Sequence, residues 1–152
     1  MTESSLLIRP AENSDSDAIA VLLHQLGYPT PAGDVPLRLE AVTRFGDAIA
    51  MVAEDPVRGV VGLITSHVFP SVHSARPIAW LTTLVTLDGV RGQGVGSKLV
   101  AFVEDWALTR GADKVAVTSA THREWAHKFY LDRGYEETGR RFVKILGGEQ
   151  TR

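Results

Sequence analysis

The sequence predicts an α/β protein in which a central mixed β-sheet carries helices on both faces, formed as one domain over residues 1–152. Apolar runs typical of strands alternate along the chain with apolar residues at helical spacing, which is the pattern of a sheet covered by helices. A glycine-rich loop joins one strand pattern directly to one helix pattern. The length of 152 residues and the hydrophobic content of 44% suit a single globular domain with a substantial core.

The first part of the chain predicts one strand followed by two helices. Residues 6–9 form a short apolar run ahead of Pro10, which predicts the first strand. Ser14 is the expected N-cap of the first helix, and Gly27 ends it. Asp34 as N-cap and Pro36 in the first turn predict a second helix. The apolar residues expected on the buried faces of these helices are Ala18, Ile19, Leu22, Leu23, Leu26, Leu39, Val42 and Phe45.

The rest of the chain predicts a hairpin, a strand–helix pair and a second strand–helix–strand unit. Turn residues 55–59 separate two strand patterns, and residues 70–77 read as a proline-bounded loop. The expected order along the whole chain is therefore β-α-α-β-β-β-α-β-α-β. The remaining strands are predicted at 49–54, 60–69, 78–87, 114–118 and 140–146, and the remaining helices directly after the glycine loop and at 125–133.

Composition argues against several classes of protein. The chain has no cysteine, so thiolate metal sites and disulfides are excluded, and the isolated histidines indicate no metal site. The net charge of −2 and the lack of a basic stripe with interleaved aromatics argue against a nucleic-acid partner. No apolar run is long enough for a membrane helix, and the N-terminus has no signal-peptide pattern. A cytoplasmic protein is the expectation.

The chemistry of the chain is predicted to lie at the glycine loop, Val90-Arg91-Gly92-Gln93-Gly94-Val95-Gly96. A helix N-terminus presents unpaired N–H groups and a positive dipole end, and glycines let an anion approach them closely. The nucleotide-binding P-loop pattern fails because Ser97 separates Gly96 from Lys98, and the dinucleotide pattern fails because its third glycine would fall at Ser97. A tight strand-to-helix turn without a ligand is the alternative interpretation.

Two motifs carry a resemblance to a known family. Arg91, Gly94 and Gly96 fit the pattern R-x-x-G-x-G, which resembles the acetyl-CoA pyrophosphate loop of the GNAT N-acetyltransferase superfamily. Residues 123–135 resemble the family pattern N-x-x-A-x-x-F-Y-x-x-x-G-[FY]. They keep Ala126, Phe129, Tyr130, Gly134 and Tyr135, while Arg123 replaces the asparagine. The predicted order of strands and helices is also similar to that of the family.

The resemblance implies an acetyl-CoA-dependent N-acetyltransferase that moves an acetyl group to a primary amine of a small molecule or peptide, directly within a ternary complex. It implies Tyr130 as the general acid for the CoA sulfur. It also implies that the fourth strand splays from the fifth at a bulge and offers its backbone to the pantetheine. The cofactor-binding residues implied are Leu84, Val85, Thr86, Arg91, Gly92, Gln93, Gly94, Val95, Gly96, Ser97 and Arg123.

The general base and the acceptor stay open at this point. The candidate bases are Glu54, His67, His73, His122 and Glu124, and a water chain is the alternative to any of them. The first two helices and the loop 70–77 are expected to recognise the acceptor, and Asp34, Glu40, Asp47 and Glu54 favour a cationic amine. A homodimer is open as the assembly. The rival functions are a CoA-binding module without turnover and a nucleotide-binding α/β domain.

Overall fold

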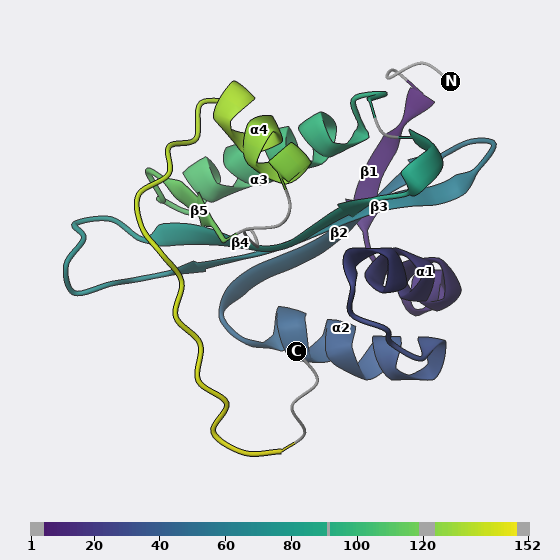
Figure 1. Cartoon of the computed structure of the whole chain (residues 1–152), viewed down its shortest axis with the longest axis horizontal. Coiled ribbons are helices and arrows are strands. Elements are labelled where there is room, and N and C mark those ends of the chain that lie inside the picture. Colours follow the sequence, from purple (N-terminus) through teal and green to yellow (C-terminus); the bar gives the residue numbers. More distant parts are fainter. Residues whose placement is uncertain (1–4, 91, 119–123, 149–152) are drawn as a thin grey trace. The chain divides into compact units, whose positions relative to one another are not determined.

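The structure is a computed structural model that describes residues 5–90, 92–118 and 124–148 (Figure 1). The chain divides into two compact units, Met1–Val117 and Thr118–Arg152. The first unit contains β1 (Leu7–Pro10), α1 (Ser16–Leu26), α2 (Val35–Arg44), β2 (Asp47–Asp55), β3 (Gly59–Phe69), β4 (Ile78–Thr86), α3 (Val95–Thr109) and β5 (Val115–Val117). Short 3-10 turns precede α1, α2 and α3 at Asn13–Asp15 (η2), Ala32–Asp34 (η3) and Asp88–Val90 (η4).

The five strands form one mixed sheet in the order β1-β2-β3-β4-β5. The neighbours from β1 to β4 are antiparallel, whereas β5 runs parallel to β4. The parallel pair is joined through α3, which is the crossover helix that such a connection needs. The predicted mixed α/β class is therefore confirmed.

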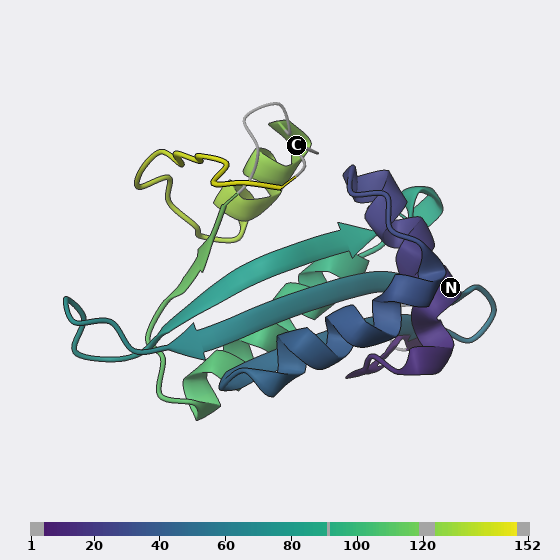
Figure 2. The same cartoon turned by 90° about the horizontal axis from the view of Figure 1, so that it is seen from below.

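Helices of the first unit cover both faces of this sheet. In Figures 1 and 2, α1 and α2 lie on one face and α3 lies on the other. The core on the α1 and α2 side is a cluster of buried side chains from five elements: Ile19, Leu22, Val35, Val52, Leu63 and Val85. On the other side, Val68 and Ala79 pack with Ala107 of α3. The apolar residues in these two clusters therefore face a helix–sheet interface, as their spacing predicted.

The entry to α1 differs from the prediction of Ser14 as its N-cap. Asp15 occupies the N-cap, and Glu12 and Asp15 form a capping box around η2. The Asp15 carboxylate accepts a hydrogen bond of 2.8 Å from the Glu12 N–H. Residues 12, 14, 15 and 16 all have acidic or hydroxyl side chains that can cap a helix. Among them, Asp15 is the one that Arg9 holds at the N-cap by hydrogen bonds.

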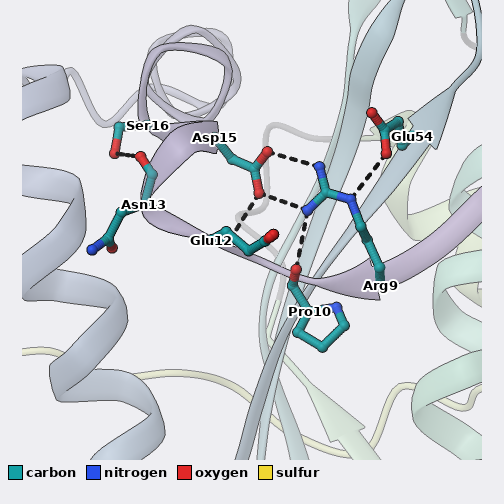
Figure 3. Close-up of polar contacts among 7 residues, drawn as sticks. All are labelled: Arg9, Pro10, Glu12, Asn13, Asp15, Ser16 and Glu54. Atoms are coloured by element: carbon teal, nitrogen blue, oxygen red, sulfur yellow. Dashed lines mark hydrogen bonds and ion pairs between the residues drawn. The ribbon is translucent and has the colours of Figure 1, made fainter.

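Arg9 ties β1 to the start of α1 and to β2 (Figure 3). Its Nη1 and Nη2 atoms donate to Asp15 Oδ2 and Oδ1 at 2.9 and 2.8 Å. Its Nε atom donates to Glu54 Oε1 at 2.9 Å. These hydrogen bonds from Arg9 lower the pKa of the Asp15 carboxyl, helped by the Glu12 N–H and opposed by burial. The network clamps the edge of the sheet to α1.

The second unit contains α4 (Glu124–Asp132) and the segment after it. Gly134 follows the helix with φ at 91°, as predicted for a residue that ends a helix. The Tyr130 ring contacts the rings of Phe129 and Tyr135, with centroids 5.3 and 5.5 Å apart. Within this unit the family-like aromatics thus form one cluster.

Two further sequence predictions are wrong. Residues 140–146 form no strand, although they carry an apolar pattern; Phe142, Val143 and Leu146 are exposed. A strand needs a neighbouring strand with which it forms backbone hydrogen bonds, and no described strand pairs with this segment. Phe45 was expected on the buried face of α2. It lies instead at the C-cap in an extended conformation and is 65% exposed.

Candidate anion cradle and acyl-transfer site

The glycine loop is the candidate anion cradle, and it lies at the start of α3. Gly94 is the N-cap of the helix with φ at +84°, a left-handed conformation that side chains with a Cβ atom rarely adopt. No side chain within the described residues caps this end of α3. The first helical hydrogen bond runs from Lys98 N–H to the Gly94 carbonyl at 3.0 Å. In an α-helix the N–H groups of the first turn lie beyond the reach of the helical carbonyls and are directed out of the positive end.

A glycine beneath α3 lets the helix begin close to the sheet. A Cβ atom on Gly62 of β3 would lie 2.9 Å from Leu99 Cδ1 and 3.0 Å from Val95 Cγ1. Val95 and Leu99 are fully buried, at 1% and 0% exposure. The first turn of α3 therefore rests directly on the β3 backbone, and this contact sets the height of the cradle above the sheet.

Two long side chains hold the connection between β4 and the cradle. The Gln25 Nε2 atom of α1 donates to the Thr86 carbonyl at 3.3 Å, and its Oε1 accepts from the Asp88 N–H at 3.5 Å. Arg58, from the β2–β3 turn, donates through Nη1 to the Gly89 carbonyl at 3.2 Å. Sequence reasoning missed both residues, because each acts on a segment far away in the chain.

The edge of β4 opens beside this connection. Pairing of β4 with β5 ends at Leu81 and Val117 within the described residues. The register between β3 and β4 shifts at Thr65 and Ser66, which leaves Thr82 as the extra residue of a bulge. The expected bulge therefore exists, and it lies just before the segment 84–86 in which a splayed strand was expected.

The backbone of β4 after the bulge alternates between its two neighbours. Leu87 N–H donates to the Val61 carbonyl at 2.8 Å. In an antiparallel ladder the bonded pairs alternate, so Val85 also bonds toward β3. Leu84 and Thr86 then direct their N–H and C=O groups toward the opened edge, where Gln25 takes the Thr86 carbonyl. Leu84 has no ladder partner on that side among the described residues.

The other expected cofactor residues fall into distinct environments. Val85 belongs to the core under α1 and α2, so only its backbone is available to a ligand. Val95, the first residue of α3, is buried against the sheet. The Gln93 N–H donates to the Val90 carbonyl at 3.2 Å. Gly92 has φ at +83°, and Ser97 lies in the first turn of α3. Arg91 and Arg123 lie outside the described residues.

The candidate bases are separated by their contacts. Glu54 accepts the hydrogen bond from Arg9, and His73 Nδ1 lies 2.6 Å from the Ser71 hydroxyl. Glu124 is the exposed first residue of α4. His67 is half-buried on β3, across from Trp80 of β4. His122 lies outside the described residues.

The described residues contain no group of three or more His, Cys, Asp or Glu side chains that could hold a metal ion. Among the helices in the same part of the chain, none has the length and apolar character needed to cross a membrane. Of the four acids expected to attract a cationic amine, Glu54 is paired with Arg9, and Glu40 lies 3.5 Å from Arg44.

Comparison with known proteins gives related sequences for much of the chain. Aminoalkylphosphonate N-acetyltransferase of Salmonella typhimurium is 39% identical over 87 residues, which cover 57% of this chain and 56% of that protein. The chain thus spans little more than half the length of that curated relative. An uncharacterized N-acetyltransferase of Bacillus subtilis, YhfO, is 28% identical over 134 residues, covering 86% of this chain and 89% of that protein.

Solved structures share the fold. A transcriptional regulator from Bacillus halodurans C-125 superposes with a TM-score of 0.82 at 23% identity, covering 93% of this chain and 99% of that one. Aminoglycoside N-acetyltransferase AAC(6')-Iy in complex with CoA gives a TM-score of 0.79 at 20% identity, covering 92% and 93%. The family model described as Acetyltransferase (GNAT) family matches residues 18–135, which include the cradle and Tyr130. The chain belongs to the acetyltransferase (GNAT) family.

Proposed function

We propose that the chain is a single acetyl-CoA-dependent N-acetyltransferase domain that transfers an acetyl group directly to a primary amine of a small molecule or peptide. One observation carries the proposal: among the described residues, a helix N-terminus with the left-handed Gly94 and no side-chain cap lies a short loop after β4, whose pairing with β5 ends at Leu81. The first feature suits a pyrophosphate, and the second suits an extended ligand with amide groups.

The residues present fit the cofactor in shape and charge. The first-turn N–H groups of α3 would bind the pyrophosphate, with Arg91 adding a positive charge and the glycines Gly92 and Gly96 keeping the backbone accessible. The Leu84 backbone would pair with the pantetheine arm as an added strand does. Acetyl-CoA supplies the acetyl group as a thioester when it is bound. An N–H directed at the thioester carbonyl would stabilise the charge that develops there.

Tyr130 is the proposed general acid. Its phenol would hold a proton for the departing sulfur, while its ring packs against Phe129 and Tyr135. Arg123 replaces the family asparagine, and we propose that it meets a phosphate or a carboxylate.

The acceptor is proposed to be a small amine. A relative of this chain is named Aminoalkylphosphonate N-acetyltransferase, which makes an aminoalkylphosphonate the first acceptor to test. The pairing of Glu40 and Glu54 with arginines weakens the earlier argument for a cationic amine. A polyamine, an aminoglycoside and a lysine peptide remain the comparison acceptors.

The test is an acceptor screen in which acetyl-CoA is mixed with 2-aminoethylphosphonate, spermidine, an aminoglycoside or a lysine peptide, and free thiol is measured. We expect thiol release that depends on both protein and amine. Calorimetry with CoA runs in parallel. CoA binding without turnover on any amine would favour the silent binding module, and displacement of CoA by ATP would favour the nucleotide-binding domain.

A further inference from the structure

The sheet face under α1 and α2 is built from rows of side chains that cross β2, β3 and β4. Val52, Leu63 and Val85 are aligned by register and form the sheet side of the apolar core. Side chains two residues apart share a face. The next two rows on this face are therefore Ala50, Thr65 and Thr83, followed by Ala48, His67 and Trp80.

These rows change from apolar to polar at the bulge in β4. The Thr65 and Thr82 hydroxyl oxygens lie 2.7 Å apart, and Thr65 is buried. One row further along, His67 is half-buried and Trp80 is 38% exposed. The β2 members of these two rows are Ala50 and Ala48, whose small side chains project only a short way from the sheet. Polar side chains and one partly exposed aromatic ring thus lie on this face beside the point where the described pairing of β4 with β5 ends.

The other face of β4 is closed at the same level. Ala79 and Leu81 point toward the α3 side and are 0% and 2% exposed, and Ser66 opposite Leu81 is fully buried. In Figure 2, α2 lies in front of the sheet and α3 lies behind it. The hairpin that joins β3 to β4 extends beyond the end of α2. Within the first unit, an acceptor that approaches the opened edge of β4 therefore meets the face with His67 and Trp80.

His67 differs from Glu54 and His73, the other described candidate bases of the first unit. No hydrogen bond or ion pair involves its ring within the described residues, whereas Glu54 is held by Arg9 and His73 by Ser71. An imidazole accepts a proton near neutral pH, which suits a base for an ammonium group. We propose that His67 is the general base for the acceptor amine and that Trp80 packs against the acceptor's carbon chain. This assignment rests on the proposed function.

The step balances in protons and electron pairs. The acceptor ammonium gives one proton to the His67 ring, and its nitrogen gains a lone pair. The nitrogen forms a bond to the acetyl carbon, and the carbon–sulfur bond breaks with its electron pair on sulfur. The sulfur takes a proton from Tyr130, the second nitrogen proton replaces the one that Tyr130 gave, and His67 releases its proton to water. The products are the N-acetyl amine, CoA thiol and one proton.

The activity test uses His67→Gln and His67→Ala, with His24→Gln on the exposed surface of α1 as the matched control. At saturating acetyl-CoA and with the amine that the wild-type protein acetylates fastest in the screen, the His67 variants should transfer acetyl groups on the order of 10²-fold more slowly or worse. Added imidazoles should restore part of the His67→Ala rate, and more basic imidazoles should restore more. CoA affinity by calorimetry should match that of the wild-type protein, which also checks the fold.

A second readout does not depend on turnover. In ring-labelled protein saturated with CoA, adding the same amine should shift the His67 imidazole resonances and leave those of His24 in place. Wild-type rates in His67→Gln, or His67 resonances unmoved by the amine, would overturn the assignment. A wild-type protein that acetylates no amine in the screen would instead overturn the proposed enzymatic function, whatever the His67 variants do.

Discussion

Gly62 of β3 and Leu99 of α3 are packed so closely that a Cβ atom on Gly62 would lie 2.9 Å from Leu99 Cδ1. Val95 closes the other side at 3.0 Å. Since both α3 side chains are fully buried, moving either of them requires its neighbours in the core to shift. This contact connects the fold to the cradle, because it positions the helix turn that begins at Gly94.

Gly62→Ala should therefore destabilise the protein by overpacking, by about 1–3 kcal/mol. It should also weaken CoA binding, since relief of the contact lifts the first turn of α3. Urea unfolding and calorimetry measure the two effects. Gly33→Ala is the control, because a Cβ atom there would meet nothing within 4 Å. Equal stability of the two variants would show that α3 shifts without cost.

The Arg9–Asp15 pair predicts a pH-dependent contribution to stability. Hydrogen bonds from Arg9 lower the pKa of Asp15 in the folded protein. Stabilisation by this group is therefore complete above the carboxyl pKa of the unfolded chain and is lost as pH falls through the lower folded pKa. Asp15→Asn should cost about 2 kcal/mol at neutral pH. The difference from the wild-type protein should shrink in acid, as urea unfolding across pH will measure.

Glu54→Gln is the matched control for Asp15→Asn, because Glu54 binds the same arginine. Its side chain is 40% exposed, compared with 6% for Asp15. Solvent screens the exposed pair, so Glu54→Gln should cost less than about 1 kcal/mol. Equal losses in both variants would contradict the role given to burial of Asp15.

Two substitutions at Gly94 separate backbone strain from blocked access to the cradle. Gly94→Val should lose about 1–2 kcal/mol of stability, because φ at +84° is strained for a residue with a Cβ atom. Gly94→Asn should be more stable, since asparagine tolerates this conformation. Both side chains should lower CoA affinity at least tenfold by calorimetry. Normal CoA affinity in a folded Gly94→Asn protein would move the pyrophosphate away from this loop.

Arg91→Ala should weaken CoA binding by about 1.5–3 kcal/mol, the range for a hydrogen bond to a charged group. Arg110→Ala is the control for the loss of one positive charge, since Arg110 lies at the opposite end of α3. Calorimetry at a fixed salt concentration should show a clear loss for Arg91→Ala and little change for Arg110→Ala. Equal affinities in the two variants would mean that Arg91 points to solvent.

The strands and helices of the first unit were predictable because periodicity reports which side of an element is buried. The strand predicted at 60–69 is β3, which begins one residue earlier, and the helix predicted directly after the glycine loop is α3, which begins within the loop at Val95. The segment 140–146 misled the prediction, because an apolar pattern does not supply a partner strand. Ser14 and Asp15 are both good N-cap residues, and the ion pair with Arg9 of β1 favours Asp15.

The geometry of the candidate site was predictable where a local motif specifies it and unpredictable where distant residues meet. The cradle at Gly92 and Gly94 follows from the order of a strand, glycines and a helix. Gln25 is 61 residues from Thr86, so no local pattern reveals their contact. The row of His67 and Trp80 depends on the register of β3 with β4 and on a bulge at Thr82, which neither strand's own pattern contains.

The last prediction concerns Tyr130 as the general acid. Tyr130→Phe keeps the ring that packs against Phe129 and Tyr135 and removes only the hydroxyl group, so stability and CoA affinity should change little. Single-turnover acetyl transfer at saturating acetyl-CoA should slow on the order of 10²–10⁴-fold, the usual range for a positioned acid. The lower end is expected, because a thiolate is a modest base and needs less help to leave. Tyr135→Phe is the control, since it removes a hydroxyl from the neighbouring ring of the same cluster and should transfer at the wild-type rate. Equal rates in Tyr130→Phe and the wild-type protein would reduce Tyr130 to a packing residue, and the sulfur would then take its proton from water.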